Sequence, residues 1–190
     1  MTEDEETCEA SEFSPLLTPR LTLRTPHEDN APAIAELAND RRVADMVSSL
    51  PHPYGIEDAD LFIDGAQGRP VFVVNCRKDG RLMGVASLRF AGRTTVAELG
   101  YWLGHTFWNQ GYATEAAHAV IDFGFRDLHL DLIEVSCRAV NNASRRVIQK
   151  CGFQYSGTGM SLSLAAGSVA VERYRMDKGC WTSLKEWGRT

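Results

Sequence analysis

A strand pattern, a glycine turn and an amphipathic helix follow one another over residues 96–128, and this order constrains the fold more than any other feature of the chain. Small residues follow Gly111 at the helix start, so several backbone N–H groups there lack both a partner and a shielding side chain. Such N–H groups, at the positive end of a helix dipole, bind phosphate oxygens. The segment indicates either a phosphate-binding loop or an ordinary helix start with a glycine before it.

The rest of the pattern predicts an α+β fold. A valine-rich strand, the hairpin signal Asp79-Gly80 and two further strands indicate an antiparallel meander. Helix, strand, helix and a last hairpin then follow. We therefore expect a mixed, mostly antiparallel sheet of about seven strands flanked by helices. The expected strands cover residues 20–24, 71–77, 82–90, 95–103, 132–138, 154–164 and 169–177, and the expected helices include residues 43–47, 56–64 and 114–128.

The order and spacing of four short motifs resemble the GNAT N-acetyltransferases, specifically the RimJ/RimL ribosomal-protein acetyltransferase type. The motifs are Leu-Thr-Pro-Arg-Leu-Thr-Leu-Arg (17–24), Glu-Leu-Gly-Tyr-Trp-Leu (98–103), Trp-Asn-Gln-Gly-Tyr-Ala-Thr-Glu-Ala (108–116) and Asn-Asn-Ala-Ser…Lys-Cys-Gly-Phe (141–153). The resemblance covers about residues 17–178. It implies a GNAT fold whose sheet splays open between its fourth and fifth strands, with coenzyme A in the gap. It also implies transfer of an acetyl group from acetyl-CoA to a primary amine.

The resemblance implies a set of residues that bind acetyl-CoA. The turn places backbone N–H groups near the diphosphate, one strand runs beside the pantetheine arm, and an asparagine contacts the arm from the other side. Asn141 has a second interpretation as a helix cap, and one residue can serve both ends. The expected cofactor-binding residues are Tyr101, Trp102, Leu103, Gln110, Gly111, Tyr112, Ala113, Thr114 and Asn141.

Two residues are candidates for the chemistry. The attacking amine must be neutral, and the resemblance implies that Glu98 removes its proton directly or through water; the alternative is a surface glutamate. Many GNAT enzymes protonate the leaving thiolate with a tyrosine, but the matching position here is Ile148. Ser144 matches the serine of the RimL type, and the resemblance implies that it donates a proton or a hydrogen bond to the sulfur. The alternative is that Ser144 only occupies the first turn of a helix.

Charge and composition bound the domain organisation. Residues 1–12 carry six acidic residues and no basic one, so removing them from the total of −5 leaves the remainder at +1. We expect an acidic, disordered tail over residues 1–16, an acetyltransferase domain over 17–178 and a C-terminal extension over 179–190. The balance gives no support for nucleic-acid binding, and no apolar run is long enough for a membrane span. The acidic start lacks the features of a signal peptide, so a cytoplasmic location is expected.

The remaining patterns exclude several kinds of site. The five cysteines have no paired or zinc-ligand spacing, so we expect reduced thiols and no metal. No Ser-His-Asp or Cys-His arrangement is recognisable, so direct attack in a ternary complex is expected. Acceptor contacts are expected from residues 41–62, including His52, and from the last hairpin. A homodimer is left open.

Three functions remain after these exclusions. The first is acetylation of a protein N-terminal α-amine or a small-molecule amine. The second is a polyamine or antibiotic acetyltransferase, and the third is a CoA-binding regulatory domain without catalysis. The missing tyrosine at Ile148 favours the third, whereas Glu98 and Ser144 argue against it.

Overall fold

The computed structural model describes residues 13–90, 92 and 95–187, so the acidic residues 1–12, with Cys8, lie outside the described residues. An eight-stranded sheet forms its centre, in the order β1-β2-β3-β4-β5-β6-β8-β7. All neighbouring strands are antiparallel except β5 and β6. The strands are β1 (Leu16–Leu17), β2 (Leu21–Arg24), β3 (Val71–Cys76), β4 (Leu82–Phe90), β5 (Val96–Leu103), β6 (Leu132–Arg138), β7 (Gln154–Ser163) and β8 (Gly167–Asp177).

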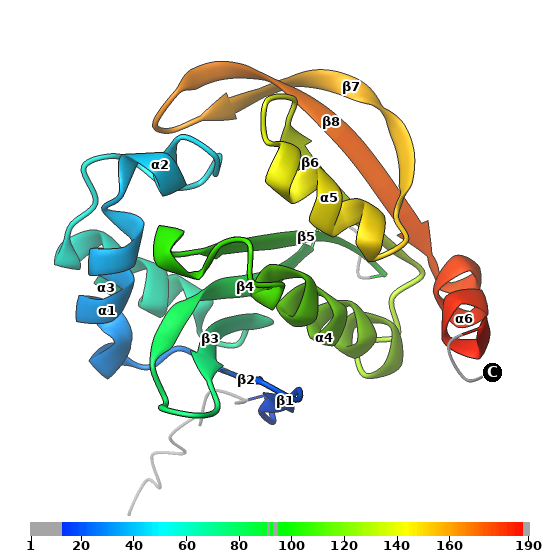
Figure 1. Cartoon of the computed structure of the whole chain (residues 1–190), viewed down its shortest axis with the longest axis horizontal. Coiled ribbons are helices and arrows are strands. Elements are labelled where there is room, and N and C mark those ends of the chain that lie inside the picture. Colours follow the sequence, from blue (N-terminus) through cyan, green and yellow to red (C-terminus); the bar gives the residue numbers. More distant parts are fainter. Residues whose placement is uncertain (1–12, 91, 93–94, 188–190) are drawn as a thin grey trace, which may run out of the picture.

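Helices cover both faces of this sheet (Figure 1). One face packs against α4 and α5, and the other packs against α1, α2 and α3. The helices are α1 (Ala31–Ala38), α2 (Arg41–Ala44), α3 (Ile56–Ala66), α4 (Tyr112–Arg126), α5 (Asn142–Lys150) and α6 (Lys178–Trp187), with short 3₁₀ turns at Glu28–Asn30 and His105–Phe107. The α+β class and the mixed, mostly antiparallel sheet are confirmed.

Strand alternation sets the two sides of the core. Leu99 and Leu103 of β5 are buried with α4, whereas Trp102 of the same strand is buried with α1 and α3. Successive side chains of a strand point to opposite faces, so every second residue of β5 joins the same layer. Glu98 therefore lies on the face of Trp102, away from α4.

The sheet opens between β5 and β6. The two parallel strands pair only where Val96–Glu98 faces Leu132–Glu134. Beyond these residues they diverge, so the last half of β5 keeps its partner β4 on one side and pairs with no described strand on the other. This is the expected opening between the fourth and fifth strands. The numbering shifts by one because the two-residue β1 adds an eighth strand.

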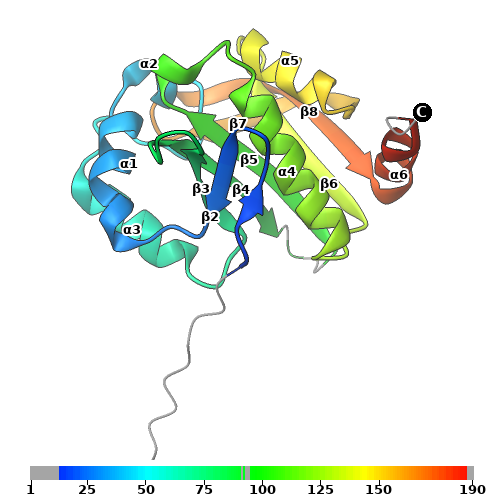
Figure 2. The ribbon, with the colours of Figure 1, turned by 60° about the horizontal axis from the view of Figure 1, so that its bottom comes forward.

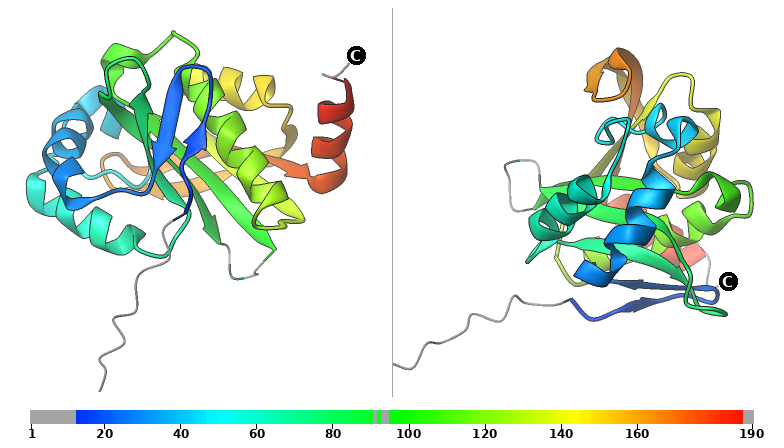
Figure 3. Two further views of the ribbon diagram at one scale, coloured as in Figure 1. Left: turned by 90° about the horizontal axis from the view of Figure 1, so that it is seen from below. Right: turned by 90° about the vertical axis from the view of Figure 1, so that its left-hand side faces the viewer.

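Both ends of the described chain pack on this body. Phe13 stacks edge-on against Phe123 with ring centroids 5.5 Å apart, so the packed chain begins before the expected boundary at residue 16. At the other end, Trp181 of α6 stacks on Phe125 and donates to Asp122 at 2.8 Å. Figure 3 shows α6 at the opposite end of the molecule from α1 and α3. None of the helices in the described chain combines the length and apolarity needed to cross a bilayer.

Candidate active site

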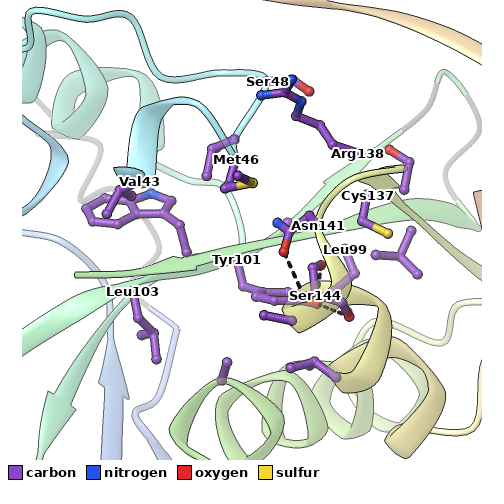
Figure 4. Close-up of a pocket in the computed structure, with 18 of the residues that line it drawn as sticks. Val43, Met46, Ser48, Leu99, Tyr101, Leu103, Cys137, Arg138, Asn141 and Ser144 are labelled. Atoms are coloured by element: carbon purple, nitrogen blue, oxygen red, sulfur yellow. Dashed lines mark hydrogen bonds between the residues drawn. The ribbon is translucent and has the colours of Figure 1, made fainter. Parts of the chain in front are cut away.

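A cavity of about 750 Å³ occupies the opening between β5 and β6. The lining comes mainly from β5, the end of β6, the starts of α4 and α5, the segment after α2 and the β7–β8 hairpin, with further residues from β4 and the loop before α4. Figure 4 shows Tyr101, Asn141 and Ser144 converging on one side of this pocket, while Met46, Ser48 and Arg138 lie on another. The cavity therefore connects the start of α4 to a second region near Met46, Ser48 and Arg138, which we call the acceptor side because acceptor contacts are expected from residues 41–62 and the last hairpin.

The glycine turn has the geometry expected of a phosphate-binding helix start. Gly111 is the N-cap of α4 with a φ of 82°, a left-handed conformation that favours glycine. It supplies no side-chain cap, so the first N–H groups of α4 have no partner within the helix. Gly111, Tyr112, Ala113 and Thr114 all line the cavity. The arrangement fits an anion at this helix start.

The partly buried carboxylate of Glu115 ties this turn to the chain next to β2. Glu115, in the first turn of α4, accepts from the Thr18 hydroxyl at 2.6 Å and from the Arg20 backbone N–H at 2.8 Å. Its second oxygen accepts from Arg20 Nε at 2.6 Å, and Arg20 also donates to the Gln110 carbonyl at 3.0 Å. Figure 2 shows α4 alongside β2, and Thr18 and Arg20 lie in the connection between β1 and β2. Burial alone raises the pKa of Glu115, but the hydrogen bonds from Thr18 and Arg20 outweigh it and lower the pKa below its ordinary value.

The predicted pantetheine strand lies where the sheet has opened. Tyr101, Trp102 and Leu103 line the cavity. The Trp108 indole donates to the Leu103 carbonyl at 2.8 Å, so this carbonyl already has a hydrogen-bond partner within the protein. Gln110 does not line the cavity, because its side-chain amide donates to the Thr106 carbonyl at 3.0 Å within its own loop.

Asn141 and Ser144 meet at the start of α5. The Asn141 side chain accepts from the Ser144 backbone N–H at 3.0 Å, so Asn141 is the N-cap of α5 and also lines the cavity. The Ser144 hydroxyl lies 2.8 Å from the Tyr101 phenol, across the opening of the sheet. Burial raises the pKa of Tyr101 well above its usual range, so the phenol stays protonated at neutral pH. The structure thus places a tyrosine hydroxyl beside Ser144 although Ile148 replaces the expected one.

Glu98 faces the acceptor side and has two partners. Its carboxylate forms an ion pair with Arg89 of β4 and accepts from the Ser136 hydroxyl at 3.2 Å. The side chain remains 34% exposed and lines the cavity. Arg89 and Ser136 hold the carboxylate in place while leaving room for a water or an amine beside it. Sequence reasoning missed both partners, because each lies on a different strand.

The thiols near the site are protonated and unpaired. No disulfide links the four cysteines within the described residues. Burial raises the pKa of Cys137, which lines the cavity, and raises that of Cys151 to about 12. A protonated thiol is a weak nucleophile, so neither cysteine is suited to form a covalent intermediate.

The acceptor side is formed by two segments that approach each other. Val43, Met46 and Val47 line it from α2 and the segment after it, and Leu162 and Leu164 line it from the β7–β8 hairpin. The Leu164 N–H donates to the Ser48 carbonyl at 3.0 Å, which joins the two segments. Part of the expected acceptor segment, residues 41–62, lines the cavity through residues 43 and 46–49. His52 is not among the lining residues.

Comparisons with known proteins agree with this geometry. The model of an acetyltransferase (GNAT) domain matches residues 20–154. An uncharacterized N-acetyltransferase of Bacillus subtilis (strain 168), YnaD, is 30% identical over 148 residues, which is 75% of this chain and 84% of that protein. A GNAT-family acetyltransferase from Bacillus anthracis superposes with a TM-score of 0.80 at 23% identity, over 87% of this chain and 99% of that one. The RimL ribosomal alpha-N-protein acetyltransferase, in complex with coenzyme A, superposes with a TM-score of 0.74 at 20% identity, over 86% and 98%.

The family match covers most of the described chain and includes both the glycine turn and the β5–β6 opening. The structural neighbours share the whole fold, and RimL ribosomal-protein acetyltransferases are among them. The chain belongs to the GNAT family and is an acetyl-CoA-dependent acyltransferase.

Proposed function

We propose that the protein transfers the acetyl group of acetyl-CoA to a primary amine, either a protein N-terminal α-amine or a small-molecule amine. The carrying observation is the single cavity that joins the uncapped start of α4 to the acceptor side at Glu98. The RimL neighbour, a ribosomal-protein acetyltransferase, favours an N-terminal α-amine. An α-amine also has an ordinary pKa of about 8, so less help is needed to make it neutral than for lysine.

In this proposal the chain holds the donor at three places. The N–H groups of Tyr112, Ala113 and Thr114 bind the diphosphate, and the open edge of β5 at Tyr101–Leu103 binds the pantetheine amides. Asn141 contacts the arm from α5. Acetyl-CoA supplies an activated carbonyl carbon and a thiolate leaving group. Gln110 is not part of this set, because its side chain bonds within its loop.

Two groups of the chain move or hold protons. Glu98 accepts the proton that the attacking amine loses, directly or through one water, as the N–C bond forms. The C–S bond then breaks, and Ser144 donates a hydrogen bond or a proton to the departing sulfur. Tyr101 supports Ser144 because its protonated phenol can donate to the serine oxygen, which leaves the serine hydrogen free to point at the sulfur. The protonated state of Cys137 supports direct attack without an acyl-enzyme.

The test measures thiol release from acetyl-CoA in the presence of a panel of amines. The panel contains peptides with different N-termini, polyamines and aminoglycosides. Acetylation of peptide N-termini supports the leading function. A preference for polyamines or aminoglycosides would instead identify the protein as a polyamine or antibiotic acetyltransferase. If the protein binds CoA by calorimetry and no amine promotes thiol release, a non-catalytic CoA-binding role replaces the proposal.

A further inference from the structure

Arg138 is the charged group of the acceptor side that the reaction leaves unused. It is the last residue of β6, it lines the cavity, and it lies on the same strand face as Ser136. Figure 4 shows its side chain extending from β6 toward Ser48, across the acceptor side of the pocket. The guanidinium donates through one terminal nitrogen to the backbone carbonyl of Asp45. This contact holds the side chain over the cavity, but a neutral carbonyl does not balance its charge.

The rest of the Arg138 guanidinium has no hydrogen-bond or ion-pair partner among the described residues. Its Nε is buried and has no hydrogen-bond acceptor in the part of the chain that the structure describes. No described carboxylate forms an ion pair with it, and Glu98, the acidic residue lining the cavity, is already bound by Arg89 and Ser136. A partly buried guanidinium that lines a cavity and has no carboxylate partner in the described chain is suited to bind an anion there.

The position of Arg138 indicates that an anion bound there is part of the acceptor molecule and not of the cofactor. The diphosphate site at α4 belongs to the other end of the cavity, and the pantetheine arm carries no charge. Residues 136 and 138 are two positions apart on one strand face, about 7 Å along the strand, and Ser136 contacts Glu98. An amine bound beside Glu98 can therefore place a group a few bonds away against Arg138.

We infer that Arg138 forms an anion subsite, and that the natural acceptor is a primary amine carrying a carboxylate or a phosphate a few bonds from the reacting nitrogen. This inference rests on the proposed function, because it uses Glu98 to place the amine. Acidic amino acids, phosphorylated amino acids and peptides beginning with an acidic residue have this chemistry. Bidentate contact from a guanidinium recognises both carboxylate and phosphate.

The test compares matched pairs of amines that differ by one charge. The pairs are glutamate with glutamine, aspartate with asparagine, O-phosphoserine with serine, and peptides beginning with Asp or Asn. Binding to the CoA-loaded protein is measured by calorimetry, and kcat/KM is measured by thiol release. We expect the wild type to favour the acidic member of at least one pair by about 10- to 100-fold, the range of a charge-assisted hydrogen bond. The carboxylate and phosphate pairs distinguish the two sources of the anion.

The substitution Arg138→Gln removes the charge and keeps an amide that can still donate to the Asp45 carbonyl. We expect the acidic preference to fall to within about threefold, through KM, while the calorimetric affinity for CoA stays unchanged. Arg138→Lys should give an intermediate preference, because it keeps the charge and loses the planar contact. Arg175→Gln is the matched control: it makes the same charge change at an exposed residue of β8 that does not line the cavity, and the preference should survive.

Several outcomes overturn the inference. They are equal binding of acidic and neutral members, an acidic preference that survives Arg138→Gln, a preference that Arg175→Gln removes equally, and absence of binding by every amine. A failure of the proposed function gives a different result: an acidic amine binds the CoA-loaded protein through Arg138, yet no thiol is released. Thiol release with neutral amines alone keeps the proposed function and removes the subsite.

Discussion

At the scale of single residues, the site depends on pairs that the fold brings together. Glu98 is held by Arg89 and Ser136 from the two neighbouring strands, and Ser144 is held beside Tyr101. In each pair one group contacts the reacting atoms in the proposed mechanism, and the other fixes its position or its proton. Substitutions at these residues should therefore change turnover more than stability or cofactor affinity.

Replacing Glu98 by Gln should lower kcat by about 100-fold, because a positioned base contributes 10²–10⁴-fold to such a step. The affinity for acetyl-CoA, measured by calorimetry, should stay within twofold, because Glu98 lies on the acceptor side. Glu134→Gln is the control, since it makes the same change at the exposed residue paired with Glu98 on β6. An equal loss of turnover and of cofactor affinity would remove the case for a base.

Ser144→Ala and Tyr101→Phe should each lower kcat by about tenfold, which corresponds to one hydrogen bond of about 1.4 kcal/mol. The double variant should be little worse than either single one, because both act through the same hydroxyl pair. Burial raises the pKa of Tyr101 above its ordinary 10, so it adds no alkaline decline to the wild-type rate below about pH 10. The pairing would be contradicted if the kcat losses of the two single variants multiplied in the double variant. It would also be contradicted by an alkaline decline of the wild-type rate below about pH 10 that Tyr101→Phe abolishes.

At the scale of elements, two helix starts form opposite walls of the cavity. The start of α4 is fixed to the connection between β1 and β2 through Glu115, and the start of α5 is capped by Asn141. Each start carries one hydrogen-bonding task for the fold and one proposed task for the cofactor. The two tasks can be separated by substitutions that keep the first and remove the second.

Asn141→Ala should cost about 1 kcal/mol of unfolding free energy, because it removes the N-cap of α5, and should also weaken CoA binding. Asn141→Ser keeps a capping oxygen and removes the side-chain amide. Chemical denaturation should therefore show nearly wild-type stability for the serine variant, while calorimetry still shows weakened CoA binding. Wild-type affinity in both variants would leave Asn141 with the cap alone.

Glu115 should make stability depend on pH in a defined window. Because its folded pKa lies below the ordinary 4.5, its contribution is complete above about pH 4.5 and is lost as the pH falls through the lower folded value. The difference in unfolding free energy between wild type and Glu115→Gln should thus be constant near neutrality and shrink in acid. Glu36→Gln, at an exposed residue of α1, is the control. A difference that grows in acid would contradict this account.

At the scale of the whole molecule, the cavity divides the sheet into two parts that a bound cofactor would join. Each part has its own helices, and β5 and β6 pair along only three residues at the base. A ligand that contacts both parts binds the folded state alone. It should therefore stabilise the entire domain.

Coenzyme A at 100 times its Kd should add about 2.7 kcal/mol to the unfolding free energy and raise Tm by about 5–10 °C. Thermal melts with increasing CoA measure this directly. Gly111→Ala should lose most of the shift, because a side chain is strained at a φ of 82° and a Cβ there would lie 3.3 Å from Arg20. A cooperative melt of this variant without ligand confirms its fold. Unchanged wild-type Tm at millimolar CoA would overturn the binding site.

Several features of the site could be predicted from local sequence. The glycine turn, the Asn141 cap and the alternation along β5 depend on residues within one or two turns of each other, so composition and spacing were sufficient. The expected start of α4 was two residues late, because Tyr112 and Ala113 already take helical geometry after Gly111. The place of Gln110 in the motif predicts a cofactor contact, whereas its side chain bonds to the Thr106 carbonyl within the loop and does not line the cavity.

The order of short amphipathic segments determined the fold class and the glycine helix start, because hydrophobic periodicity and turn residues act over short distances along the chain. The opening of the sheet was expected from the family resemblance of the motifs and not from periodicity. Only the tertiary structure decided the partners of the functional groups. The contacts between Glu115 and Arg20, Tyr101 and Ser144, and Arg138 and Asp45 join residues 95, 43 and 93 positions apart. Side chains so distant in sequence meet only after the strands have paired and the helices have packed. Local sequence patterns therefore do not predict these contacts.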